Sequence, residues 1–249
     1  MMRWLAILIA FLTAPLGAQA IPDPRATVAR GIAAHGGELW CSPGTLILSG
    51  HAEFYDPKTG ELLRRIDDYR MWRVFDHDRE SAHGAEGKVR ILAREGERTF
   101  FEVGYDGETT WNQNGIVPTA EADAMWSSNF GFGVIRSALA DGFTLERAPP
   151  RDIGGHRIEL VRVIDPQGAP TLFGFDAESG FIRYLAFDSP RGFHERVYDD
   201  FVKLESGWVQ AREVTLLYDG VKANTVFWRE VRVGERIADE VFAWRGKAK

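Results

Sequence analysis

Apolar and polar residues alternate along most of the chain. Within residues 45–55, Leu46, Leu48, Ala52 and Phe54 share one face, and polar residues occupy the other. A period of two is typical of β-strands that bury one face and expose the other. Similar alternating runs continue into the C-terminal part of the chain. The pattern therefore predicts a protein built mainly of β-strands.

Short turns separate the alternating runs. In Asp56–Gly60, proline presets φ and glycine adopts the left-handed conformation. Strands joined by such turns pair with their sequence neighbours, and a sheet of about ten twisted strands curls. We therefore predict a mainly β fold, a curled antiparallel sheet or half-open β-barrel. Further turns containing glycine are expected at residues 94–97, 105–107, 165–168, 176–180, 205–207 and 218–220.

Three helices are expected besides the sheet. Residues 24–37 have apolar positions at helical spacing and end in two glycines. Thr119 can cap a short helix at residues 120–127, and residues 133–140 resemble another, ended by glycine. Between these last two helices lies an aromatic, glycine-rich loop. The pair predicts a short helical lid over one face of the sheet.

The first twenty residues have the features of a secretory signal peptide. Arg3 precedes an apolar run, and Ala18-Gln19-Ala20 matches the small residues preferred at the cleavage site. The run is shorter than the ~18–20 residues that span a bilayer, so we expect cleavage after Ala20 and no integral membrane span. Residues 21–249 are then expected to form a single domain. Its one cysteine, Cys41, lies well beyond the cleavage site and predicts neither a lipid anchor nor an internal disulfide. These features favour a soluble, periplasmic protein.

Charge and motifs exclude several classes of function. The net charge is −6 with interspersed acids and bases, so nucleic acid is not an expected partner. No Gly-x-Ser-x-Gly sequence or dinucleotide-binding fingerprint occurs. His77 and His83 lie with Asp76, Asp78 and Glu80 in the polar loop 76–88, but their spacing matches no compact metal site. We therefore predict no catalytic residue, no metal and no cofactor. A hydrolase remains a weaker alternative.

Aromatic residues are the strongest functional signal. The chain has eight tryptophans and sixteen phenylalanines, and several adjacent pairs would place aromatic rings on both faces of the sheet. The second apolar face is then either core packed under helices or the lining of an apolar cavity. The set as a whole favours a cavity. The residues expected to bind its ligand are Trp72, Trp111, Trp126, Phe130 and Phe132.

The order of these segments resembles the bacterial periplasmic lipoprotein-sorting proteins, the Lol carriers and their relatives. The resemblance rests on residues 33–37 leading into 46–50, on the hairpin Tyr105–Trp111 and on the turn Phe175–Ile182. The ending, Val231–Phe242, resembles the closing strand of that family. The resemblance implies an N-terminal helix and a curled sheet closed by a helical lid. No transport-specific residue of the family can be assigned to a position here.

The resemblance and the aromatic residues lead to one expected function and one alternative. The first is a non-enzymatic periplasmic carrier or binding protein that shelters a lipid or lipoprotein acyl chain in the concave face of the sheet. An envelope lipoprotein is then a possible partner. The alternative is a protein-interaction module that docks an envelope partner through a sheet edge or the loop Phe130–Phe132. A lipid that co-purifies with the protein would favour the carrier.

Overall fold

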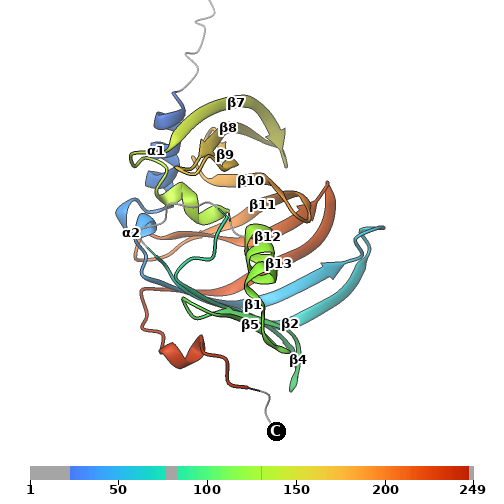
Figure 1. The fold of residues 1–249 in the computed structure, drawn as a ribbon. Helices are drawn as coiled ribbons and strands as arrows, with labels where there is room; N and C mark the ends of the chain where they lie inside the picture. The colour runs from blue at the N-terminus through green and yellow to red at the C-terminus, as the bar shows by residue number, and fades with distance from the viewer. Residues whose placement is uncertain (1–22, 77–82, 130, 247–249) are drawn as a thin grey trace, which may run out of the picture.

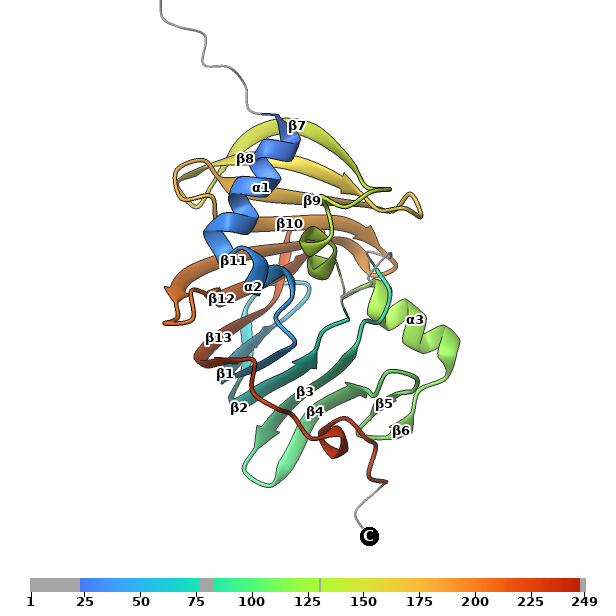
Figure 2. The same cartoon turned by 90° about the vertical axis from the view of Figure 1, so that its left-hand side faces the viewer.

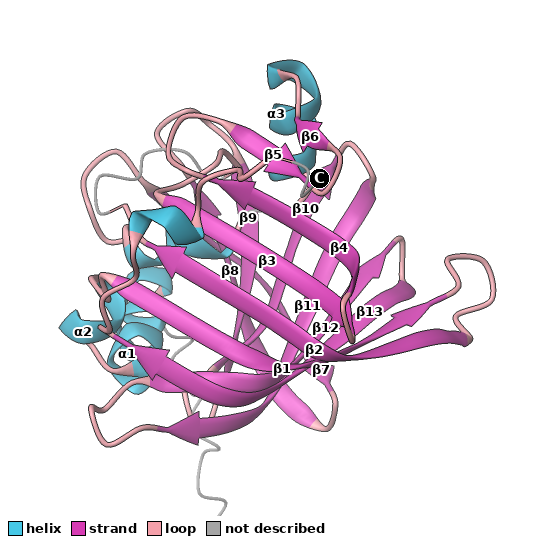
Figure 3. Cartoon of the chain, turned by 90° about the horizontal axis from the view of Figure 1, so that it is seen from below, coloured by secondary structure: helices cyan, strands magenta, loops and turns pink. Residues whose placement is uncertain are grey.

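The computed structural model describes residues 23–76, 83–129 and 131–246. In these ranges thirteen antiparallel strands form one curled, unclosed sheet accompanied by a few short helices (Figures 1 and 3). The predicted fold class is confirmed, although the sheet has more strands than the ten or so expected. The strands are β1 (Thr45–Tyr55), β2 (Leu62–Val74), β3 (Lys88–Glu95), β4 (Arg98–Tyr105), β5 (Thr110–Asn112), β6 (Gly115–Ile116), β7 (Thr144–Ile153), β8 (His156–Ile164), β9 (Pro170–Asp176), β10 (Ile182–Ser189), β11 (Gly192–Lys203), β12 (Val209–Tyr218) and β13 (Val221–Val233).

Two of the additional strands, β5 and β6, are too short to show a period. The sequence predicts that the chain leaves the sheet from Asn112 to Pro118. That prediction is wrong, because Trp111 of β5 still pairs with Ile116 of β6. Both strands follow the predicted turn at residues 105–107.

The strand β7 contains Pro149-Pro150, which no sequence pattern would assign to the middle of a sheet. It is the last strand in the sheet order, and its pairing with β8 is irregular between Ala148 and Arg151. Proline cannot donate a main-chain hydrogen bond, but an edge strand with a bulge tolerates it. The prolines therefore explain both the position of β7 and the break in its register.

The order of strands in the sheet is β6-β5-β4-β3-β2-β1-β13-β12-β11-β10-β9-β8-β7. Each half is a meander of sequence neighbours, as predicted. The two halves are joined by pairing between β1 and β13, the first and last strands of the chain. The two edge strands, β6 and β7, are therefore consecutive in sequence, and the segment that connects them runs from one edge of the curled sheet to the other.

We call residues 119–141 of this connection the lid segment. It contains α3 (Thr119–Ser127) and the 3₁₀ helix η1 (Phe132–Arg136) (Figure 2). Thr119 is the first residue of α3 and does not cap it, since the residue before the helix is Pro118 and no side chain caps the helix. The helix expected at residues 133–140 is the shorter η1, followed by turns.

The N-terminal helix α1 (Pro24–His35) lies against strands of the β7–β12 half of the sheet (Figure 2). It starts after Asp23 and ends at Gly36, whose φ of 125° is unfavourable for other residues. The shorter helix α2 (Glu38–Cys41) follows it directly. The helix predicted at residues 24–37 is confirmed, with its end at the predicted glycines.

After β13 the chain crosses the outer side of the opposite half of the sheet. Phe242, which is fully buried, follows the 3₁₀ helix η2 (Asp239–Val241). Its main-chain oxygen accepts a hydrogen bond of 2.6 Å from Nε1 of Trp111. The resemblance implies a closing strand within residues 231–242, but the strand ends at Val233. The remainder does not pair as a strand, and it contacts Lys88 and Arg90 of β3 and Trp111 of β5.

Candidate functional site

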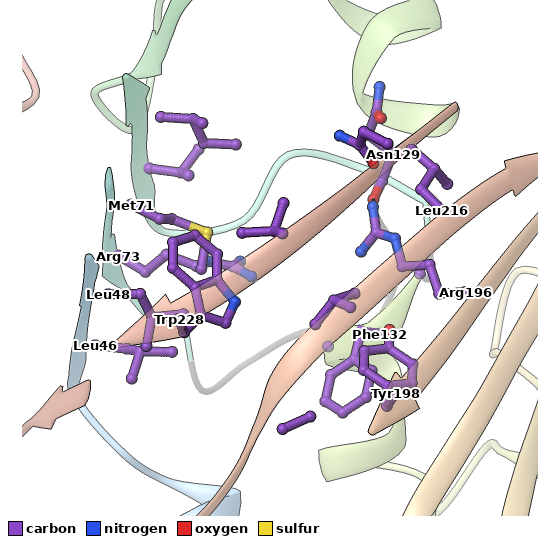
Figure 4. Close-up of a pocket in the computed structure, with 18 of the residues that line it drawn as sticks. Leu46, Leu48, Met71, Arg73, Asn129, Phe132, Arg196, Tyr198, Leu216 and Trp228 are labelled. Atoms are coloured by element: carbon purple, nitrogen blue, oxygen red, sulfur yellow. Dashed lines mark hydrogen bonds between the residues drawn. The ribbon is translucent and has the colours of Figure 1, made fainter. Parts of the chain in front are cut away.

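A cavity of about 560 Å³ lies between the concave face of the sheet, the helices at its end and the lid segment (Figure 4). This volume is within the range of ~300–1,000 Å³ that is typical of ligand pockets. Strands from both halves of the sheet contribute to its lining. The apolar lining residues include Leu46, Leu48, Phe54, Met71, Val89, Ile91, Phe101, Val103, Val214, Leu216, Val226 and Trp228.

Strand register explains which side chains face the cavity. Met71 of β2 lies opposite Leu48 of β1 and Ile91 of β3, and Ile91 lies opposite Val103 of β4. Residues paired across strands share a face, so these four side chains form one continuous apolar row. All four line the cavity.

The neighbouring row holds two of the predicted ligand-binding residues and faces the other way. Trp72 pairs with Arg90, Arg90 with Gly104, and Gly104 with Trp111. The Arg90 guanidinium lies 5.4 Å from the Trp72 ring centroid and 5.8 Å from that of Trp111. The C-terminal segment with Phe242 packs on this face. Trp72 and Trp111 thus lie outside the cavity lining. These strands carry aromatic residues on both faces because one face lines the cavity and the C-terminal segment covers the other.

The lid segment supplies two of the predicted residues to the cavity. Trp126 and Phe132 both line it, whereas Phe130 lies outside the described residues. Trp126 is 3% exposed and donates a hydrogen bond of 2.8 Å from Nε1 to Oγ1 of Thr110. Its ring also meets that of Tyr105 edge-on. Trp126 therefore anchors α3 to the edge of the sheet as well as covering the cavity.

Phe132 packs the lid segment against α2 and against strands of the β7–β13 half of the sheet. Its ring centroid lies 5.2 Å from that of Tyr198, 5.9 Å from Trp40 and 6.2 Å from Phe173. Aromatic pairs at such distances add to the stabilisation from burial alone. Figure 4 shows Phe132 beside Tyr198 at one side of the cavity.

An arginine lies inside the cluster of aromatic residues at the helical end. The Arg136 guanidinium is 4.5 Å from the Trp40 ring centroid and 4.7 Å from that of Phe75, and Nε donates to the Trp40 main-chain oxygen over 2.9 Å. Stacking on aromatic rings stabilises a guanidinium with little surrounding water. Arg136 thereby ties η1 to the region of α2.

The buried histidine of α1 has a structural role. His35 is 3% exposed, and its Nε2 accepts a hydrogen bond of 2.9 Å from the main-chain N–H of Ile182. Nδ1 must then carry the proton and donate to the Val209 main-chain oxygen at 3.3 Å. Burial lowers the pKa of His35 to about 4, so the ring is neutral near pH 7.

Arginine and tyrosine residues in the lining are the part of the site that the sequence analysis missed. Arg73, Arg136, Arg191 and Arg196 contact the cavity, and the described lining includes no aspartate or glutamate. The alternation along β11 places Arg196 on the same face as Tyr198. A charged residue in an alternating strand usually faces solvent, so the sequence alone does not indicate that Arg196 faces the cavity.

The described residues contain no group of three or more histidine, cysteine, aspartate or glutamate side chains that could hold a metal ion. Of the polar loop considered above, His77 and two of the acidic residues lie outside the described ranges. No helix in those ranges is both long and apolar enough to span a membrane. The predicted signal peptide, residues 1–20, also lies outside them.

Several solved structures share this architecture. An outer-membrane lipoprotein-sorting protein domain from Vibrio parahaemolyticus matches with a TM-score of 0.54 and 10% identity, over 88% of this chain and 95% of that one. A DUF1329 family protein from Desulfovibrio piger matches with a TM-score of 0.56 and 8% identity, over 88% and 95%. A LolA superfamily protein from Nitrosomonas europaea matches with a TM-score of 0.51 and 9% identity, over 88% and 97%.

No protein-family model matches the sequence, and neither does any curated protein. At identities of 8–10% the shared feature is the fold, which extends over nearly all of the described chain. The resemblance to lipoprotein-sorting proteins expected from the order of segments is thus confirmed in three dimensions. The chain has the open, curled sheet of a LolA-like fold.

Proposed function

We propose that this protein is an exported periplasmic carrier that shelters the acyl chain of a lipid or lipoprotein in the cavity. The observation that carries the proposal is the continuous apolar lining of a cavity of about 560 Å³ beneath a lid segment. The similarity in fold to the lipoprotein-sorting protein domain from Vibrio parahaemolyticus supports it. The proposal includes neither a catalytic step nor a cofactor.

The lining is chemically suited to a hydrocarbon chain. Each methylene group moved from water into such a cavity contributes about 0.8 kcal/mol. Leucine, isoleucine, valine and methionine side chains dominate the face formed by β1–β4. These side chains have no hydrogen-bonding groups, so water does not compete with a hydrocarbon chain for binding to them. Trp126 and Phe132 line the cavity, and they are the members of the predicted ligand-binding set that we expect to contact such a chain.

The protein-interaction alternative has less support. The edge strand β7, through which a partner strand would add, contains two prolines and an irregular register. Proline removes the main-chain donors that strand addition requires. Phe132 of the proposed docking loop packs inward against Tyr198 and Trp40. These contacts favour a role in covering the cavity.

Leu216→Trp should block the cavity. Leu216 lines it, and its partners across the sheet, Arg196 and Asn224, line it too. An indole at this position would occupy space that the proposed ligand uses. We expect the affinity for a fluorescent fatty-acid probe to fall by about tenfold or more, equivalent to at least ~1.4 kcal/mol, while the melting temperature changes little.

The adjacent residue provides the control. Leu217 lies outside the lining, and so do its cross-strand partners Glu195 and Lys222. Leu217→Trp adds the same side chain to the other face of the strand, so probe affinity should stay near the wild-type value. Equal probe affinities of the two folded variants would contradict the proposal.

A further inference from the structure

The charges in the cavity are all of one sign. Four arginines contact it, and none of the described lining residues is acidic. Two of the four are already accounted for. Arg73 forms an ion pair with the buried Glu86 at 3.2 Å, and Arg136 is stacked among aromatic rings. Arg191 is exposed and lies over the Tyr218 ring.

Arg196 differs from these three. It is half-buried on β11, and its Nη2 donates to a neutral acceptor, the main-chain oxygen of Asn129, over 2.6 Å. Within the described ranges it forms no salt bridge with a carboxylate. A guanidinium has five N–H donors, so one bond to a carbonyl leaves most of its hydrogen-bonding capacity for another group. A cation in an apolar setting is stabilised when an anion binds next to it.

Tyr198 lies two residues further along the same face of β11. Its side chain lines the cavity and is 7% exposed, and its hydroxyl is buried without a hydrogen-bond partner in the described part of the chain. A buried hydroxyl that lacks a partner costs free energy, so a ligand oxygen there would be stabilising. Burial raises the pKa of Tyr198, and the charge of Arg196 and its approach to the Tyr198 hydroxyl oppose that increase, although the two groups do not meet the geometry of a hydrogen bond. The phenol therefore remains protonated at neutral pH.

The two groups lie on one side of the cavity. Figure 4 shows Arg196 and Tyr198 on the strand opposite Leu46, Leu48 and Met71, with Asn129 of the lid segment next to Arg196. A head group at Arg196 would therefore allow the chain attached to it to run over the apolar face of β1 and β2.

We propose that the ligand is an anionic amphiphile, and that Arg196 and Tyr198 bind its carboxylate or phosphate oxygens. The proposal rests on the proposed function and adds the class of head group to it. The guanidinium supplies a charge-assisted pair of donors and the phenol supplies one more. Neutral lipids of equal chain length would leave both groups without a partner.

The test uses delipidated full-length mature protein and displacement of a neutral fluorescent probe, N-phenyl-1-naphthylamine. The competitors are palmitate, its methyl ester, phosphatidylglycerol and the diacylglycerol with the same acyl chains, so that each anionic competitor has a counterpart without an anionic group. We expect at least one anionic competitor to displace the probe at a concentration about tenfold lower than its neutral counterpart, the size of one charge-assisted hydrogen bond. Preference for palmitate would indicate a free fatty acid, and preference for phosphatidylglycerol an anionic phospholipid.

Variants assign that preference to residues. Arg196→Gln should reduce the anion preference about tenfold and leave the binding of neutral competitors unchanged, whereas Arg196→Lys should retain part of the preference. Tyr198→Phe removes only the hydroxyl and should weaken anion binding severalfold without affecting the fold. Arg212→Gln is the control, because Arg212 is exposed, pairs with Asp200 and lies outside the lining.

The outcomes separate the two proposals. Competitors that bind equally well whatever their charge, or an anion preference that persists in both Arg196→Gln and Tyr198→Phe, would overturn this inference and leave the carrier proposal intact. Failure of the probe and every competitor to bind would overturn the carrier proposal itself. Should Arg196→Gln melt far below the wild type, the nearly isosteric Tyr198→Phe decides the assignment.

Discussion

Phe175→Ala is expected to lower the free energy of unfolding by about 3–5 kcal/mol, the usual cost of removing a fully buried phenylalanine. Phe175 of β9 has no exposed surface and lies directly under Gly31 of α1. A methyl group at Gly31 would overlap the Phe175 ring. The close approach of α1 to β9 thus depends on the Phe175 ring in the sheet and on glycine, which has no side chain, at position 31 of the helix. Equilibrium denaturant unfolding measures the effect.

A double-mutant cycle makes this explanation specific. Gly31→Ala alone should destabilise the protein by about 1–3 kcal/mol because the added methyl overpacks the contact. In the Phe175→Ala background the same change should be neutral or stabilising, since space is present and alanine favours a helix by ~1 kcal/mol over glycine. The account of α1 packing would be wrong if Gly31→Ala had the same effect in both backgrounds.

Acid is expected to destabilise the protein before its carboxylates are protonated. The pKa of His35 is lowered from 6.5 to about 4 mainly by burial, with the Val209 hydrogen bond opposing the decrease and the Arg136 charge adding to it. Protonation would put a second donor against the Ile182 N–H. The stability that depends on neutral His35 is therefore complete above pH 6.5 and is lost as the pH falls from 6.5 to about 4, by about 3 kcal/mol.

His35→Gln tests this assignment. The variant should be less stable than the wild type at pH 7, but the decrease in its free energy of unfolding between pH 6.5 and 4 should be about 3 kcal/mol smaller. Burial also lowers the pKa of His194, to about 2, so part of the acid sensitivity should persist in the variant. Urea unfolding at several pH values provides the measurement. Identical pH dependence of the two proteins would contradict a role for His35.

Local signals in the sequence predicted much of the fold. The turn at Asp56–Gly60 and the other glycine turns have distinctive residues, and each connects neighbouring strands in the structure. Pairing of β1 with β13 has no such signal, because it joins residues far apart in the chain through side chains that any buried strand could contain. The path of the C-terminal segment over Trp111 could not be predicted either, because it depends on which face of β3–β5 no other segment covers.

The candidate site was only partly predictable for the same reason. Trp126 and Phe132 were identifiable because they belong to a glycine-rich segment with little other apolar surface. Trp72 and Trp111 have equally apolar surroundings, but the register of β2–β5 places them on the face away from the cavity. Arg196 was missed because alternation alone does not show whether a charged position faces solvent or the interior of a curled sheet.

Native mass spectrometry tests the central claim most directly. The full-length chain and its Leu216→Trp and Leu217→Trp variants would be expressed in a bacterial host and recovered from the periplasm without detergent. The proposed function predicts that the wild type and Leu217→Trp carry an added mass of one lipid molecule, and that Leu216→Trp lacks it. No added mass in any of the three proteins, or the same added mass in all three, would contradict the claim that the concave cavity shelters an acyl chain.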